Sequence, residues 1–256
     1  MDAGRLAALQ QEPDSPEALA TIPHVCLSDL PRDPAPVPTE LREDGNVIIH
    51  DLQTDGIVYT TAYFAADDLT PEELRPIALS YLKPKRMPHV LGTEQEAVRL
   101  TRRYGGDETQ ARIAALLHDC TKKLEMPEQL ALCKQYGIEL DELEQKALKL
   151  LHSKTGAAIA RSVFGVEDAV YDAIWYHTTG RPDMTRLEKI LYLADYIEPS
   201  RDFPGVEELR RAVYEDLDHG LLLGLNMTIQ EMEEMGNPVH HQTRDARDYL
   251  LKRGIR

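Results

Sequence analysis

From Thr70 to its C-terminus, the chain repeats one pattern that strongly limits its fold: a capping residue, apolar residues at helical spacing, and a glycine or proline that stops the helix. Thr70 opens the first such segment. Pro71 and two glutamates follow it, which favours a helix start because the threonine side chain accepts a free backbone N–H and the acidic groups suit the helix dipole. Pro84 stops this helix. The pattern predicts a mainly helical domain over residues 70–256.

The same signals predict the helices that follow. Pro88 begins a helix that Gly105 ends, and Asp107 begins the next with the spacing of a capping box. Further helices are expected at 127–136, 141 to about 151, 153–164 after a break, 167–177, 185–196, 206–235 and 244–253. The longest of these is expected to be kinked or split near Gly220 or Gly224.

The first 69 residues have a different composition. Residues 1 to about 40 carry many prolines among acidic and small residues, which is typical of a loosely packed arm. Asn46–His50 and Ile57–Phe64 are β-branched and aromatic, and Asp51–Gly56 between them has turn chemistry. We therefore predict a Pro-rich arm and a small β-hairpin over residues 1–69, accessory to the helical domain over 70–256.

Charge and cysteine content narrow the function classes. Lysine and arginine number 29 against 44 acidic residues, and the net charge of −15 argues against a broad nucleic-acid surface. The three cysteines have no recognisable ligand spacing, as expected of a protein from a reducing compartment. No apolar run approaches the roughly 20 residues that span a bilayer. We expect a cytoplasmic protein that binds neither nucleic acid nor membrane.

The chemistry begins with the adjacent pair His118-Asp119. Ala111, Ala114 and Ala115 share a helix face with His118, so its imidazole is predicted to point into the core. An imidazole and a carboxylate on neighbouring residues cannot drift far apart. The pair therefore predicts two ligands for one metal site.

Two more helices direct polar groups inward in the same way. Val170, Ala173 and Ile174 share a face with His177, and Asp195 falls on the apolar stripe that begins at Leu187. A lone inward histidine is usually a satisfied core residue rather than a ligand. A coincidence of several such inward groups on separate helices is much less expected than one alone. The groups are His89, His118, Asp119, His152, His177 and Asp195. Such a mixed set suits manganese, iron or zinc and two-metal hydrolysis, with Asp119 as the bridging ligand.

Longer strings around these residues resemble a known family. They are Leu82-Lys-Pro-Lys-Arg-Met-Pro-His, Ala115-Leu-Leu-His-Asp-Cys-Thr-Lys, Tyr176-His-Thr-Thr-Gly-Arg-Pro and Leu193-Ala-Asp-Tyr-Ile-Glu-Pro. From about Leu82 to the C-terminus, the chain resembles the YqeK-type symmetrical bis(5'-nucleosyl)-tetraphosphatases, which are HD-domain phosphohydrolases. The resemblance implies an HD-domain helical bundle.

The resemblance also implies an activity and a site. The activity is the hydrolysis of diadenosine tetraphosphate to two ADP by a dinuclear centre, of iron or else manganese, that holds a hydroxide. By position, one ion would be held by His89, His118, Asp119 and Asp195, and the other by Asp119, His152 and His177. Lys122 and Arg181 would contact phosphate during catalysis, and Thr178, Thr179 and Arg201 are weaker candidates for substrate contacts.

Other interpretations of single residues stay open. Lys122 and Lys123 could be a solvated helix end, and Arg181 could pair with Asp183 or Glu188. We expect His219, His240 and His241 to be surface residues. His50 and Cys120 receive no role. The arm and hairpin are expected either to form a homodimer or to pack over the substrate mouth.

Three functions fit these observations. The first is the symmetrical tetraphosphatase, and the second keeps the metals but acts on another nucleotide, such as a deoxynucleoside triphosphate, an alarmone or a cyclic dinucleotide. The third is a metal-stabilised module that binds a protein partner through its acidic surface. Lys122 and Arg181 beside a complete ligand set favour an enzyme.

Overall fold

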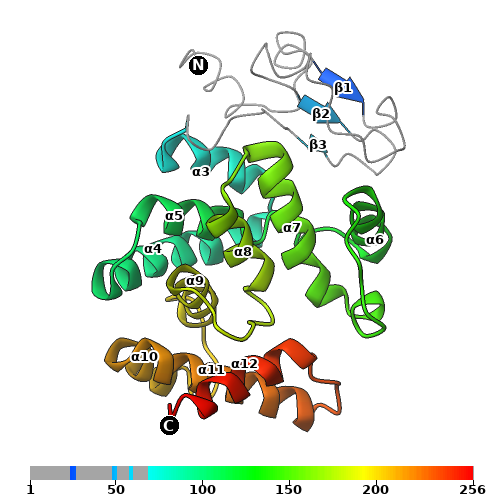
Figure 1. Ribbon diagram of the computed structural model, residues 1–256. Coiled ribbons are helices and arrows are strands. Elements are labelled where there is room, and N and C mark those ends of the chain that lie inside the picture. Colours follow the sequence, from blue (N-terminus) through cyan, green and yellow to red (C-terminus); the bar gives the residue numbers. More distant parts are fainter. Residues whose placement is uncertain (1–23, 27–47, 51–57, 60–68, 256) are drawn as a thin grey trace.

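The computed structural model describes residues 24–26, 48–50, 58–59 and 69–255, and its larger part is helical (Figure 1). The α-helices of this part are α3 (Pro71–Ser80), α4 (Met87–Tyr104), α5 (Glu108–Leu117), α6 (Met126–Gln135), α7 (Leu148–Phe164), α8 (Asp168–Tyr176), α9 (Arg186–Ile197), α10 (Val206–Glu215), α11 (Leu217–Glu234) and α12 (His241–Lys252). Two short 3-10 helices, η4 (Pro84–Arg86) and η5 (Glu144–Lys146), precede α4 and α7. The prediction of a mainly helical fold is confirmed.

Three very short strands precede the helices. β1 (His24–Cys26) runs parallel to β2 (Ile48–His50), and β2 runs antiparallel to β3 (Val58–Tyr59). A hairpin of the predicted length is not supported, because its turn and the outer residues of both strands lie outside the described residues. Nearly all of the predicted Pro-rich arm lies outside them as well.

The predicted capping residues begin their helices. Thr70 forms a capping box with Glu73, in which each side chain accepts from the other residue's backbone N–H. Asp107 accepts from two backbone N–H groups of α5, and Thr185 accepts from the backbone of Glu188 in α9. These caps set where α5 and α9 begin, and therefore which way their last side chains point.

Two predicted helix breaks were wrong. Helix α7 runs through residues 151–153 without interruption. The long C-terminal helix is divided at Asp216, before either glycine, because Asp216 adopts an extended backbone and its carboxylate caps α11 through the N–H of His219. A capping aspartate therefore decides the break, while Gly220 and Gly224 lie inside α11.

Helices α4, α5, α8 and α9 pack against one another at the centre of the helical domain. In Figure 1, α9 lies between α8 and the C-terminal helices α10 to α12, and α4 pairs with α5. Leu100, Leu116 and Leu191 from three different helices are fully or almost fully buried there. Burial of such side chains is the main driving force for this arrangement. It brings the ends of α5, α8 and α9 to one place.

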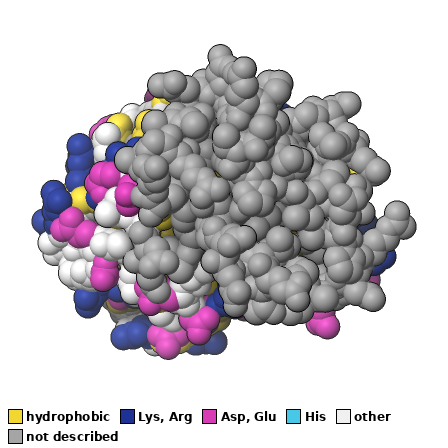
Figure 2. All heavy atoms as spheres, turned by 90° about the horizontal axis from the view of Figure 1, so that it is seen from above, with side chains coloured by type: hydrophobic (Ala, Val, Ile, Leu, Met, Phe, Trp, Pro, Cys, Tyr) yellow, Lys and Arg dark blue, Asp and Glu magenta, His cyan; other side chains and the backbone are white. Residues whose placement is uncertain are grey.

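The described surface is mixed in charge. Over the part of the upper face that belongs to described residues, Lys and Arg side chains alternate with Asp and Glu, without a continuous basic patch (Figure 2). Among the described helices, we find none with the length and apolar character that a membrane crossing needs.

Gly220 and Gly224 form a matched pair for testing the α10–α11 packing. A Cβ at Gly220 would lie 2.6 Å from Val213 Cα, whereas a Cβ at Gly224 would meet Tyr196 at an ordinary 3.4 Å. We expect Gly220→Ala to lower the free energy of unfolding by about 1–3 kcal/mol through overpacking. Gly224→Ala should raise it by about 0.5–1 kcal/mol through helix propensity. Urea unfolding measures both, and equal effects would contradict this packing.

Candidate metal centre

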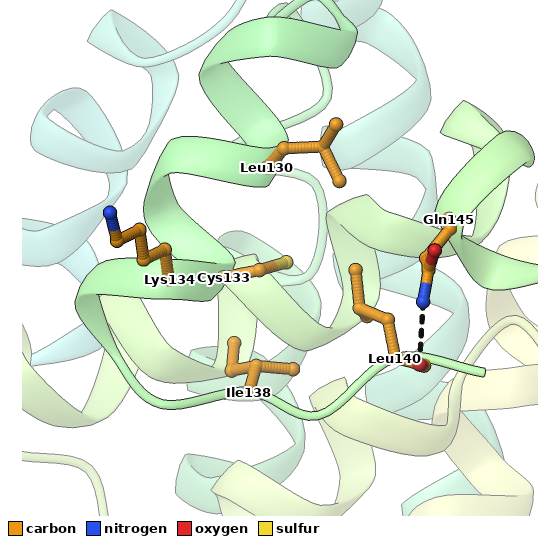
Figure 3. Close-up of a pocket in the computed structure, with 6 residues that line it drawn as sticks. All are labelled: Leu130, Cys133, Lys134, Ile138, Leu140 and Gln145. Carbon is orange, nitrogen blue, oxygen red and sulfur yellow. Dashed lines mark hydrogen bonds between the residues drawn. The ribbon is translucent and has the colours of Figure 1, made fainter. Parts of the chain in front are cut away.

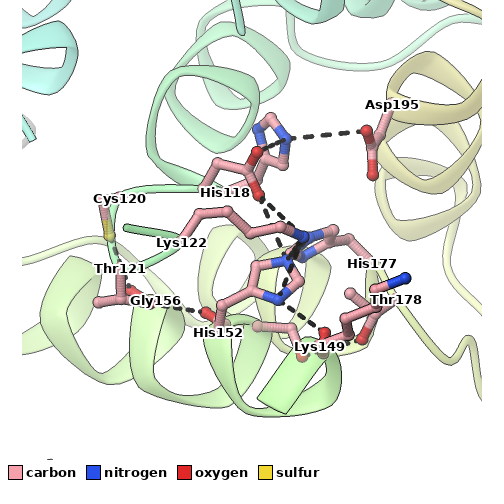
Figure 4. Close-up of polar contacts among 12 residues, drawn as sticks. His118, Cys120, Thr121, Lys122, Lys149, His152, Gly156, His177, Thr178 and Asp195 are labelled. Carbon is pink, nitrogen blue, oxygen red and sulfur yellow. Dashed lines mark hydrogen bonds and ion pairs between the residues drawn. The ribbon is translucent and has the colours of Figure 1, made fainter. Parts of the chain in front are cut away.

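The six predicted ligands lie together at the centre of the helical domain, and four of them appear in Figure 4. They come from five helices: His89 from the first turn of α4, His118 and Asp119 from the end of α5, His152 from α7, His177 from the end of α8, and Asp195 from α9. Five of them are buried, and the Asp195 side chain is 18% exposed. The site is therefore shielded, with one open side near Asp195.

The two carboxylate oxygens of Asp119 face different histidines. Oδ2 lies 3.5 Å from His118 Nε2 and 3.8 Å from His89 Nε2. Oδ1 lies 3.2 Å from His152 Nε2. One side chain thus stands between two groups of nitrogen atoms, as a bridging ligand must.

Each imidazole of the site has its Nδ1 engaged. His118, His152 and His177 place Nδ1 at 2.7–2.8 Å from the backbone carbonyl three residues earlier. His89 places Nδ1 3.0 Å from Glu198 Oε1. Because a carbonyl or carboxylate oxygen can only accept, each Nδ1 carries a proton and each Nε2 presents a lone pair to the centre.

Several hydrogen-bond acceptor atoms of the site lie close to one another. His152 Nε2 lies 3.1 Å from His177 Nε2, and His89 Nε2 lies 3.0 Å from Asp195 Oδ1. His89 Nε2, His118 Nε2 and Asp119 Oδ1 are buried and have no hydrogen-bond partner. Lone pairs at these distances repel unless a cation or a proton lies between them. The residues therefore fit bound metal ions.

Protonation states agree with ligand chemistry. Burial and the Lys122 ammonium lower the pKa of His152 to about 4, and burial and His118 lower the pKa of His177 to about 4. Burial opposes ionisation of Asp119, but its contacts with His118, His152 and Lys122 outweigh this and hold its pKa well below the usual range. At neutral pH, His152 and His177 are therefore neutral and Asp119 is charged, which are the forms that bind metals.

Three cationic side chains border this centre. Arg86 Nε donates to Asp119 Oδ2 at 2.5 Å, and Arg201 Nη2 donates to Asp195 Oδ1 at 2.6 Å. Lys122 Nζ lies 3.0 Å from His152 Nε2, and burial lowers the pKa of its ammonium. Lys122 is exposed, with 34% of its side chain accessible, but its ammonium reaches His152 and Asp119. The roles of Lys122 and Arg201 in substrate binding stay predictions.

Other predicted substrate residues lie differently. Arg181 forms two hydrogen bonds of 2.7–2.8 Å with the buried Glu188 and stacks over Tyr176. Thr179 is buried and bonds to Gly180 and Gln242. Thr178 donates to Ser153, next to His152. The pairing with Glu188 favours a structural role for Arg181, and the roles of both threonines stay predictions.

Comparison with known proteins points to the part of the chain that carries the metal centre. The HD domain family matches residues 86–200. The symmetrical bis(5'-nucleosyl)-tetraphosphatase of Halalkalibacterium halodurans is 38% identical over 179 residues, which cover 68% of this chain and 95% of that protein. The Bacillus subtilis protein of the same name is 38% identical over 67% of this chain and 92% of its own length.

The chain belongs to the symmetrical bis(5'-nucleosyl)-tetraphosphatase family.

A solved structure extends the likeness to this family's fold. A predicted HD superfamily hydrolase involved in NAD metabolism from Clostridium acetobutylicum has a TM-score of 0.69 and 42% sequence identity, and the match covers 72% of this chain and 98% of that protein. The fold over most of the chain is therefore that of an HD superfamily hydrolase.

The N-terminal part matches something else. Residues 1–84 match the model of a peptidase-associated family. Presequence protease 1 of Arabidopsis thaliana is 40% identical over 72 residues, which cover 7% of that protein. The sequence reasoning had no signal for this similarity, and the small share of the protease carries no activity to this chain.

Two residues at the tetraphosphatase centre escaped the sequence reasoning. Arg86 bonds Asp119, and Glu198 bonds His89. Both stand inside the family strings, Arg86 three residues before His89 and Glu198 three residues after Asp195. Their position inside these strings, close to predicted ligands, was the available signal for both.

A second histidine group lies at the start of α12. His240 was expected on the surface but is only 5% exposed, whereas His219 and His241 are exposed as expected. His240 Nδ1 accepts from the backbone N–H of Gln242, so its proton sits on Nε2, 3.3 Å from Glu144 Oε1 and 3.4 Å from Asp141 Oδ2. This nitrogen lies at ion-pair distance from both carboxylates but forms no hydrogen bond among the described residues, and His240, Asp141 and His241 together are a further group that could hold a metal ion. His240 thus forms an electrostatic contact between the start of α12 and the acidic residues Asp141 and Glu144 around η5, and we call this contact the clasp.

An apolar hollow of 390 Å³ beside this loop is separate from the centre (Figure 3). It is lined by Leu130, Cys133, Lys134, Ile138, Leu140 and Gln145.

Burial raises the pKa of the Cys133 thiol to about 11 and that of Cys120 to about 12, so both thiols are protonated and unreactive. Cys120 therefore has no chemical role beside Asp119.

The clasp predicts a pH dependence of stability. Burial opposes ionisation of Glu144, but His240 and Lys154 outweigh it and lower its pKa from 4.5 to about 2. A depressed pKa stabilises the fold above the unfolded-state value, and this contribution disappears as the pH falls toward 2. Glu144→Gln should therefore be less stable than the wild type near neutral pH, and the gap should close in acid.

Urea unfolding at several pH values checks this expectation. Glu139→Gln is the matched control, because Glu139 is an exposed glutamate of the same loop. A gap for Glu144→Gln that stays constant down to pH 3 would contradict the clasp.

Proposed function

We propose that this chain hydrolyses diadenosine tetraphosphate to two ADP at the centre around Asp119. The observation that carries the proposal is the joint presence of family membership over 92–95% of the relatives' length and of the complete ligand cluster. Relatives named symmetrical bis(5'-nucleosyl)-tetraphosphatase point to the substrate and to cleavage at its middle.

Two metal ions are part of the proposal. His89, His118 and Asp195 would hold one ion, His152 and His177 the other, and Asp119 would contribute one oxygen to each. We propose iron, with manganese as the alternative, because imidazole and carboxylate ligands suit both. Bound there, the ions would supply a water made nucleophilic near neutral pH and would neutralise phosphate charge.

The protein's own cations would hold the substrate. Arg86 and Arg201 pair with the carboxylates of Asp119 and Asp195, and with metal bound there the two guanidinium groups would be available to phosphate oxygens. Lys122 Nζ lies 3.9 Å from Asp119 Oδ1 as well. Guanidinium groups bind phosphate through paired hydrogen bonds. These three side chains would orient the polyphosphate so that its central bridge lies at the metal centre.

The reaction balances with one water. The water oxygen forms a bond to one inner phosphorus, and the bond from that phosphorus to the central bridging oxygen breaks. The bridging oxygen leaves with the other nucleotide, so each half departs as ADP. The buried ligand histidines would shield this step, and the partly exposed side chains of Arg86, Lys122, Arg201 and Asp195 border the centre.

Several wider expectations belong to this proposal. We expect the enzyme to work in the cytoplasm, in keeping with its three cysteines, a small and odd number. The homodimer and the accessory role of residues 1–69 stay predictions.

The products test the reaction. Metal-loaded protein incubated with diadenosine tetraphosphate should release ADP alone, and Asp119→Ala should lose both hydrolysis and bound metal, because both ions would share that carboxylate. Chromatography of the nucleotides and elemental analysis measure these outcomes. ATP plus AMP, or no product, would contradict the proposal. A higher kcat/KM for another nucleotide would show that this nucleotide, and not diadenosine tetraphosphate, is the preferred substrate.

Arg86 tests the substrate contacts. Arg86→Ala should lower kcat/KM for the tetraphosphate about 10- to 100-fold, since a hydrogen bond to a charged group contributes about 1.5–3 kcal/mol. Arg102→Ala is the control, because Arg102 pairs with Glu108 on the exposed surface. Equal kinetics of the two variants would exclude Arg86 from phosphate binding.

A further inference from the structure

His89 differs from the other histidines of the centre in how it is held. His118, His152 and His177 each bond a carbonyl three residues earlier, so their own helices orient them. His89 instead bonds Glu198, which lies 109 residues later in the chain. Its orientation therefore depends on a contact between α4 and the end of α9.

Glu198 is itself fixed. It is fully buried at the C-terminal end of α9. Its Oε2 accepts from the backbone N–H of Ser200 at 2.7 Å, and its Oε1 accepts from the Ser200 hydroxyl at 2.5 Å. These bonds to Ser200, together with the contact to His89, hold the carboxylate in one position.

Gly92 leaves the space for that carboxylate. A Cβ at Gly92 would lie 2.5 Å from Glu198 Oε2, 3.3 Å from Glu198 Cδ and 3.4 Å from Pro199 Cδ. Glycine inside a helix costs about 1 kcal/mol relative to alanine. Close approach of the carboxylate explains why α4 has a glycine one turn after His89.

We propose that Glu198 is a positioning residue, which keeps the His89 proton on Nδ1 and leaves Nε2 free for a metal ion, and that Gly92 makes room for it. This inference rests on the proposed metal centre. Partners of this kind orient the ring and increase its basicity, and their loss commonly weakens metal affinity about 10- to 100-fold.

The main test measures metal rather than activity. Chelator-stripped protein is titrated with Mn²⁺ by calorimetry for the wild type, Glu198→Ala, Glu198→Gln and Gly92→Ala. Glu198→Ala and Gly92→Ala should weaken binding of one ion about 10- to 100-fold. Glu198→Gln should lose less, because its amide oxygen still accepts from His89 Nδ1. Gly224→Ala, an α11 variant with ordinary space for the methyl group, should bind like the wild type.

A second measurement keeps the proposal testable if a variant does not fold. Long-range proton–nitrogen NMR of the metal-free wild type reports where each imidazole proton sits. The His89 ring should carry its proton on Nδ1. A ring protonated on Nε2 alone, or unchanged Mn²⁺ affinity in Glu198→Ala and Gly92→Ala, would overturn the inference.

These readouts separate the inference from the proposed function. A protein that binds Mn²⁺ through an Nδ1-protonated His89 but does not cleave diadenosine tetraphosphate would contradict only the substrate. A wild type that binds no metal would contradict both.

Discussion

The structure depends on the burial of one negative charge. Asp119 has no solvent exposure, and a carboxylate in that position is stable only with opposite charge or several hydrogen-bond donors around it. The Arg86 guanidinium donates to Asp119 Oδ2 and the Lys122 ammonium lies near Oδ1, while imidazole groups surround the same carboxylate. Because the inward imidazole atoms are lone pairs rather than N–H groups, the imidazoles themselves do not satisfy it. Metal ions would satisfy the carboxylate and the imidazoles together.

Helix ends do much of the positioning. His118 and His177 stand at the C-caps of α5 and α8, where the backbone carbonyls are free of full helical pairing and accept from Nδ1. The negative end of a helix dipole also favours a cation nearby. Two helices that end at the same place therefore provide both the tautomer and part of the field that a metal ion needs. His89 comes from the start of α4 and relies on Glu198 instead.

Much of this arrangement followed from local pattern. Caps such as Thr70 and Asp107 set the helix starts, and the apolar faces around His118 and His177 indicated which side chains point inward. The same reasoning missed Arg86, Glu198 and the burial of His240, because each depends on a contact across tens of residues that periodicity does not record. The break in the long C-terminal helix was predicted near a glycine but lies at Asp216, because the capping aspartate and not a glycine decides where α11 begins. Family likeness supplied the substrate, which no single spacing contains.

The central claim is that two cations lie on either side of Asp119. Anomalous diffraction from crystals of the protein loaded with iron or manganese tests it most directly. Two peaks are predicted, one next to His89 and Asp195 and the other next to His152 and His177, each in contact with one oxygen of Asp119. No peak at this cluster, with Asp119 still bonded to Arg86, would contradict the account.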